Sequence, residues 1–135
     1  MRTAKGTLEE LDRLLDELKE RPHDTVLLVE GRKDVSALWV LGVEGEVWQV
    51  QTGQSIFQLA ERLAQEKKKA IILTDWDRKG GQICRLLRKA LEANGVPYDD
   101  NQRTRLVRIS KKEIKDVESL PAFMSRLVSE AEKER

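Results

Sequence analysis

Cysteine is almost absent from this 135-residue chain, which carries one cysteine, Cys84, and one histidine, His23. A single cysteine excludes an internal disulfide and a cysteine-based zinc site, and it fits a reducing cytoplasm. The chain also lacks a long apolar run and an apolar leader, so we expect a cytoplasmic location without a membrane span. The fold must therefore rest on an ordinary hydrophobic core, which a domain of this length can bury.

The chain also has few aromatic residues and nearly equal numbers of acidic and basic residues. Phe, Trp and Tyr together make up 4% of the chain, which argues against a platform that stacks single-stranded bases. Lys and Arg number 25 against 24 Asp and Glu, so the net charge of +1 excludes a passive, strongly basic nucleic-acid coat. Contact with nucleic acid would need a local basic patch, a metal ion or a protein partner.

Strand-like and helix-like segments alternate along the chain. Short apolar, β-branched runs predict four buried strands, at 25–29, 47–50, 70–74 and 106–109. Apolar residues at helical spacing predict helices at 7–21, 34–41, 55–66, 82–94 and 120–130, followed by a frayed tail. We expect Thr7 with Glu10 to cap the first helix, and Ser55 or Thr52 to cap the third. The alternation indicates an α/β fold with a mostly parallel four-stranded sheet flanked by helices.

Acidic residues follow two of the predicted strands directly. Glu30 ends the first strand, and Asp75 and Asp77 follow the third, each with a glycine nearby. Residues two apart in extended chain point the same way, and ligands of parallel sheets bind at the carboxyl ends of the strands. Carboxylates held together repel one another unless a cation such as Mg²⁺ or Mn²⁺ neutralises them. Taken singly, these acids also fit helix caps or solvated loop residues.

Two of these segments resemble motifs of the topoisomerase–primase (Toprim) family. TVLLVEGRKD at 25–34 looks like the first motif, a strand that ends in Glu-Gly, and IILTDWDRKG at 71–80 looks like the second, an Asp-x-Asp pair with a glycine shortly after it. The resemblance extends from 25 to about 119 and implies a compact Rossmann-like Toprim fold. Residues 23–135 would form the Toprim domain. The leucine-rich helix within 1–22 would pack on it or, alternatively, pair with another subunit.

The resemblance also separates the roles of the acids. It implies that Asp75 and Asp77 hold Mg²⁺ or Mn²⁺, with Glu30 nearby as general acid or base. The segment 111–118 is similar to a lysine–aspartate segment after the last strand of small Toprim proteins. By that similarity Asp116 and Glu118 would extend the metal site and Lys115 would neutralise a phosphate. A solvated charged loop is the other interpretation of this segment.

Basic residues flank the acids on both sides. Lys and Arg next to a metal suit a phosphodiester, and glycine amides at a helix start suit a phosphate. The predicted phosphate-binding residues are Arg32, Lys33, Arg78, Lys79 and Gly80. Ordinary surface charge is the competing interpretation. Trp76, between the two aspartates, would stack on a base or pack against a neighbouring loop.

The remaining sequence features reduce the number of Toprim activities that the chain could have. Within the family, a topoisomerase needs a tyrosine nucleophile on a separate domain, whereas the only tyrosine here is Tyr98, in a predicted turn. A bacterial-type primase needs a zinc module that this chain lacks. The leading hypothesis is a magnesium-dependent nuclease for RNA or structured nucleic acid, similar to the catalytic domain of ribosomal-RNA-maturing Toprim ribonucleases. A non-catalytic nucleic-acid-binding subunit and a primase-like nucleotidyl transferase are the alternatives. The choice between RNA and DNA stays open.

Overall fold

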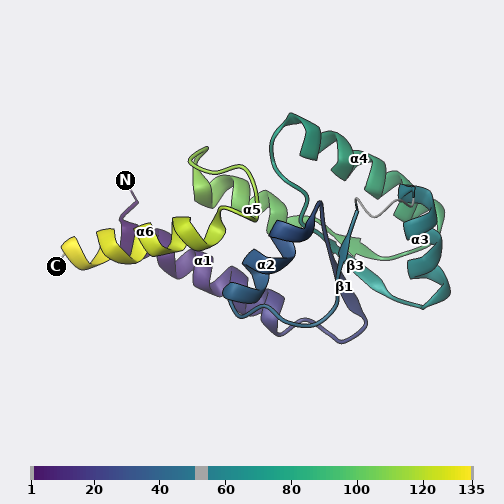
Figure 1. Cartoon of the computed structure of the whole chain (residues 1–135), viewed down its shortest axis with the longest axis horizontal. Helices are drawn as coiled ribbons and strands as arrows, with labels where there is room; N and C mark the ends of the chain where they lie inside the picture. Colours follow the sequence, from purple (N-terminus) through teal and green to yellow (C-terminus); the bar gives the residue numbers. More distant parts are fainter. Residues whose placement is uncertain (1, 51–54, 135) are drawn as a thin grey trace.

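The computed structural model describes residues 2–50 and 55–134, which form four strands and six helices (Figure 1). The strands are β1 (Thr25–Val29), β2 (Val47–Gln49), β3 (Lys69–Ile72) and β4 (Tyr98–Asp99). The helices are α1 (Ala4–Lys19), α2 (Arg32–Val40), α3 (Ile56–Gln65), α4 (Arg78–Ala93), α5 (Asn101–Ser110) and α6 (Leu120–Lys133). Ser55 caps α3 as predicted, while Thr52 lies outside the described residues. No helix among the described residues is long and apolar enough to cross a membrane.

The sheet is parallel throughout, with the strand order β2-β1-β3-β4, which confirms the predicted α/β fold. From β1 the chain moves outward to β2 and then returns past β1 to β3. The topology therefore switches direction between β1 and β3. In such sheets the loops that leave the two central strands diverge and open a crevice at the carboxyl edge.

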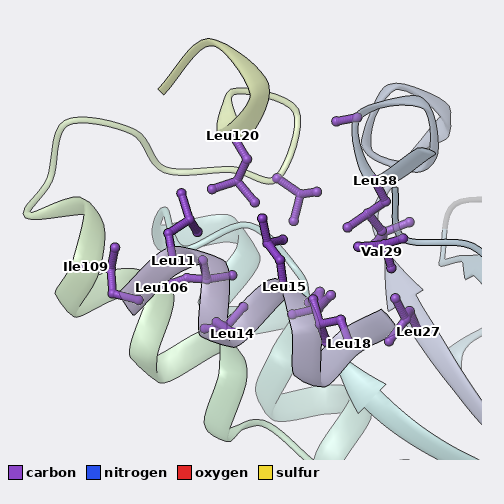
Figure 2. Packing of buried hydrophobic residues seen from close by; sticks show 14 of the residues in the cluster. Leu11, Leu14, Leu15, Leu18, Leu27, Val29, Leu38, Leu106, Ile109 and Leu120 are labelled. Carbon is purple, nitrogen blue, oxygen red and sulfur yellow. The ribbon is translucent and has the colours of Figure 1, made fainter. Parts of the chain in front are cut away.

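Helices cover both faces of the sheet, which explains why its central strands are apolar in nearly every position. Leu27 and Val29 point into a cluster with α1, α2, α5 and α6, whereas Val26 and Leu28 point into a second cluster with α3 and α4. Right-handed crossovers that run in opposite directions along a sheet place their helices on opposite faces. Figure 2 shows the leucines of α1 between β1 on one side and Leu106 and Ile109 of α5 on the other.

The first helix begins earlier than predicted. Thr3, not Thr7, caps α1: its hydroxyl oxygen accepts from the Gly6 amide, and Thr7 lies buried inside the helix. The amides of Ala4 and Lys5 donate to the Glu134 carboxylate at 2.9 and 3.2 Å. The prediction of a frayed tail is therefore wrong. Helix α6 continues to Lys133, and the next residue, Glu134, accepts from the first two amides of the neighbouring helix α1. That cap joins residues 130 positions apart, which no local sequence pattern reveals.

The fourth strand is not where the sequence placed it. Leu106–Ile109 belongs to α5, and the strand beside β3 is Tyr98–Asp99, in the segment predicted as a turn. A short run such as Leu-Val-Arg-Ile fits both strand and helix periodicity. The helix prevails because its buried residues recur at helical spacing: Gln102, Leu106, Ile109 and Ser110. The mostly parallel four-stranded sheet was predicted correctly, but one of its strands was assigned to the wrong residues.

If α1 is part of the domain core, truncating a leucine on its inner face will destabilise the whole fold. Leu14 is fully buried, so Leu14→Ala is expected to lower the free energy of unfolding by about 2–5 kcal/mol, measured by urea denaturation. Val128→Ala on the exposed side of α6 is the control, with a change within about 0.5 kcal/mol. Equal, small losses in both variants would contradict the assignment of α1 to the core.

Candidate metal centre

Three acidic side chains meet at the carboxyl ends of the two central strands. Glu30 directly follows β1, Asp75 lies just beyond β3, and Asp77 is the residue before α4. One carboxylate oxygen from each residue lies within 4.8 Å of the other two. This edge is where the topology of the sheet switches direction, the usual ligand-binding position of an open parallel sheet.

Glu30 and Asp77 are held by backbone amides. Glu30 is buried, and its Oε2 accepts a hydrogen bond of 2.8 Å from the Asp75 amide, so the ends of β1 and β3 are linked through this side chain. Asp77 Oδ1 accepts from the Gly80 amide at 2.7 Å and caps α4. The helix-cap interpretation therefore applies to Asp77, without removing it from the acidic cluster.

Asp75 occupies the least favourable environment for a carboxylate. Burial, and then the charge of Glu30, raise the pKa of its carboxyl to about 7, with smaller contributions from Asp34, Asp116 and Asp77. Its buried Oδ1 accepts no hydrogen bond from any described residue. A carboxylate so placed requires a proton or a cation to neutralise it.

A divalent cation fits this donor set. The convergent atoms are all carboxylate oxygens, which are the ligands that Mg²⁺ and Mn²⁺ prefer. Asp77 uses one oxygen for the Gly80 amide and keeps its other for an ion, whereas Glu30, which uses Oε2 for the Asp75 amide, keeps Oε1 for either an ion or a proton. The side chains of Asp75 and Asp77, with Glu30 behind them, would hold the metal.

Gly80 has a steric role that its sequence position did not reveal. A Cβ atom at this residue would lie 1.9 Å from the Asp75 carbonyl oxygen, so only glycine fits. The buried hydroxyl of Thr74 donates to the Gly80 carbonyl at 3.0 Å and ties the two ends of the loop together. The Gly80 amide is already bonded to Asp77, and its predicted phosphate contact stays a prediction.

Asp34 is a residue of the site that the sequence analysis did not single out. It is buried, one of its oxygens accepts from the Gly31 amide at 3.1 Å, and the other accepts from the Glu118 amide at 3.0 Å. Burial, as the largest cause, raises the pKa of its carboxyl. Asp34 therefore joins the turn after Glu30 to the segment near 118. Its place within the first motif was the only signal, and that signal did not distinguish it from a helix-start acid.

The segment 111–119 does reach the acidic edge, although it follows a helix and not a strand. The Trp76 amide donates to the Lys115 carbonyl at 2.8 Å, and the Trp76 indole nitrogen donates to the Ile114 carbonyl at 2.8 Å. Trp76 thus packs against the neighbouring loop, one of the two interpretations of its position. The charge of Asp116 also raises the pKa of Asp75. Direct ion binding by Asp116 or Glu118, and a phosphate contact by Lys115, stay predictions.

The flanking cations lie on the solvent side of the acids. The side chains of Arg32, Lys33, Arg78 and Lys79 are exposed. Lys33 approaches Glu118 at 3.9 Å, but both side chains are more than half exposed, so this pair contributes little to stability. These cations are therefore free to contact an anionic ligand beside the acidic cluster.

The chain matches known proteins in sequence and in fold. The family model of the Toprim domain matches residues 25–109. A protein named "UPF0292 protein" from Methanosarcina barkeri is 40% identical over 121 residues, which cover 89% of this chain and 84% of that protein. Another "UPF0292 protein", from Thermococcus sibiricus, is 40% identical over 121 residues, covering 88% and 91%. A solved structure of a protein from Aquifex aeolicus is 28% identical, with a TM-score of 0.69 over 81% of this chain and 96% of that one.

Replacing Asp75 will change how stability depends on pH. An aspartate titrates at about 3.9 in an unfolded chain, against about 7 in this fold, so between these values the native state holds a proton that the unfolded state releases. Stability of the metal-free protein from this group therefore falls as pH rises from about 4 to about 7. Asp75→Asn removes that loss, and its stability advantage over wild type is expected to grow between about pH 4.5 and about pH 8.

Urea denaturation in a chelator measures this difference, and excess Mg²⁺ is the control. Mg²⁺ is expected to stabilise the wild type, because a ligand that binds only the folded state favours folding, and to leave Asp75→Asn nearly unchanged. An advantage of Asp75→Asn that is the same at both pH values would show that Asp75 is not the titrating carboxyl.

The two adjacent glycines at the start of α4 offer a matched steric test. Gly80→Ala drives a methyl group into the Asp75 backbone, whereas the corresponding atom at Gly81 would meet Arg103 Nη2 at an ordinary contact distance of 3.9 Å. We expect Gly80→Ala to destabilise the fold and weaken Mn²⁺ binding. Gly81→Ala should be neutral or stabilise the helix by up to about 1 kcal/mol. Calorimetric unfolding and Mn²⁺ titration give the comparison, and equal behaviour of the two variants would contradict the close approach at Gly80.

Proposed function

The chain belongs to the Toprim domain family, and we propose that it is a divalent-metal-dependent nuclease that cleaves phosphodiester bonds in RNA or structured nucleic acid. Family membership indicates a metal-dependent, nucleic-acid-related function. The observation that carries the nuclease proposal is the acidic triad of Glu30, Asp75 and Asp77 with exposed cations beside it. This combination suits an anionic polymer held across a metal ion.

The position of the site favours a polymeric substrate over a small molecule. A hollow of about 480 Å³ lies at the opposite, amino end of the strands, near Thr25, Lys69 and Tyr98, and none of the three acids lines it. The acids lie at the carboxyl edge, beside exposed arginines and lysines of two loops. Side chains of this kind bind the backbone phosphates of a long nucleic acid without reading its sequence.

The position of each side chain indicates a different role in the proposed reaction. Asp75 and Asp77 would hold the ion, which when bound neutralises phosphate charge and stabilises the charge that develops during displacement. Glu30 Oε2 is engaged by the Asp75 amide, so Oε1 is the atom that would accept or deliver a proton. Arg32, Lys33, Arg78 and Lys79 would orient the phosphate backbone from the solvent side.

A covalent tyrosine mechanism has no support in this chain. Tyr98, its single tyrosine, lies in β4, and its hydroxyl donates to Glu92 at 3.2 Å. It lines the hollow at the amino end of the sheet, away from the edge that carries the acids. Water is therefore the nucleophile we assign to the cleavage.

Glu30→Gln tests the proton-transfer role with little steric change, because the glutamine oxygen can still accept from the Asp75 amide. With Mg²⁺ or Mn²⁺ and mixed RNA and DNA substrates, we expect wild-type cleavage and a loss of about 100-fold or more in Glu30→Gln. Asp75→Ala should abolish metal-dependent cleavage. Glu61→Gln, an exposed charge change on α3, is the matched control and should cleave like wild type.

The other outcomes distinguish the alternatives. Cleavage by Glu30→Gln and Asp75→Ala at the wild-type rate would remove the site assignment. Salt-sensitive binding without turnover, together with a copurifying protein, would indicate a non-catalytic subunit. Nucleotide incorporation on a template would indicate a primase-like transferase.

A further inference from the structure

Arg103 contacts the metal-site loop from a distant part of the chain. This arginine of α5 donates from Nε to the Thr74 carbonyl at 3.0 Å and from Nη2 to the Asp75 carbonyl at 2.7 Å. The two carbonyls belong to consecutive residues that lead directly into the acidic cluster. Their partner lies 29 and 28 positions further along the chain, on a helix that the sequence analysis had interpreted in part as a strand.

Those two carbonyls lie beyond the reach of the sheet. The pairing of β3 with β4 ends at Ile71 and Asp99, because β4 has only two residues. On the other side of β3, the backbone hydrogen bonds to β1 end with the one that the Leu73 amide donates to the Leu28 carbonyl. Thr74 is fully buried, and a buried carbonyl without a partner costs free energy. The guanidinium of Arg103 supplies the hydrogen bonds that a longer neighbouring strand would otherwise provide.

Arg103 donates to the backbone carbonyls of Thr74 and Asp75 and forms no ion pair with a described residue. Across residues 2–50 and 55–134, no carboxylate forms an ion pair with it, whereas its helix neighbour Arg105 pairs with Glu17 at 2.7 Å. Bonds from a charged guanidinium to carbonyl oxygens are stronger than neutral ones, and the planar fork fixes two acceptors at once.

We propose that Arg103 is a positioning residue for Asp75, which sets the direction from which the Asp75 carboxylate meets the metal ion. The inference rests on the proposed metal-dependent function. Three contacts fix Asp75: Glu30 accepts from its amide, the Gly80 backbone packs against its carbonyl so closely that a Cβ atom would not fit, and Arg103 donates to that carbonyl. Without Arg103 the Asp75 carbonyl loses the one charged donor that it has among the described residues, and the peptide that carries Asp75 can rotate.

Mn²⁺ affinity, measured by calorimetric titration of the full chain, tests this role without relying on catalysis. Arg103 reaches the two carbonyls from two different nitrogens, whereas glutamine is shorter, uncharged and has a single nitrogen, so Arg103→Gln cannot reproduce both bonds. We expect Mn²⁺ to bind to this variant roughly 10–100-fold more weakly. Arg103→Lys keeps the charge but not the fork, and should fall between Arg103→Gln and wild type. Arg105→Gln loses an ion pair on the same helix, and should change thermal unfolding but not Mn²⁺ affinity.

The variants separate the failure of this inference from the failure of the metal site itself. Asp75→Asn is the reference: if it binds Mn²⁺ as tightly as wild type, the proposed metal site is wrong. If Asp75→Asn loses binding but Arg103→Gln retains wild-type affinity, the metal site stands and the role of Arg103 is overturned. The same loss of affinity in Arg103→Gln and Arg105→Gln would also overturn it, because a general loss of stability would then explain both.

Discussion

The central constraint on this structure is the repulsion among carboxylates gathered at the ends of β1 and β3. Four lie close together there, two of them buried: Glu30, Asp34, Asp75 and Asp77. Charges of one sign in a partly dry site oppose folding, as the raised pKa of Asp75 indicates. The surrounding fold must therefore hold these carboxylates in place against their own repulsion, and a bound cation would relieve it.

The chain meets this constraint mainly through its backbone. Carboxylate oxygens of Glu30 and Asp34 accept from loop amides, and one of Asp77 accepts from an amide in the first turn of α4, so each acid also fixes the backbone beside it. Hydrogen bonds to the ionised form favour the charged state of a carboxylate. Asp75 differs, because its Oδ1 has no such donor among the described residues. The acid with the least compensation is thus the one for which binding a cation brings the largest gain.

The parts of the site that could be predicted were those encoded locally. Acids at the ends of apolar strands, with period-two spacing between Asp75 and Asp77, are visible in any ten-residue window. The parallel sheet then brings Glu30 to them. The long-range contacts that hold the site were not visible in this way. Asp34 accepts from the Glu118 amide across 84 positions, and Gly80 must be a glycine because the Asp75 backbone packs against it. Contacts of this kind depend on tertiary approach, which composition and periodicity do not report.

The short fourth strand determines how the site is supported. Since β4 is only two residues long, the end of β3 has no neighbour there, and the chain covers it with the start of α5. Arg103 lies one helical turn before Leu106, which packs with the leucines of α1 in the same cluster. The N-terminal helix, which precedes the region matched by the family model, therefore fixes the helix that in turn holds Asp75. A site that reads as two short motifs in sequence depends physically on a helix outside both.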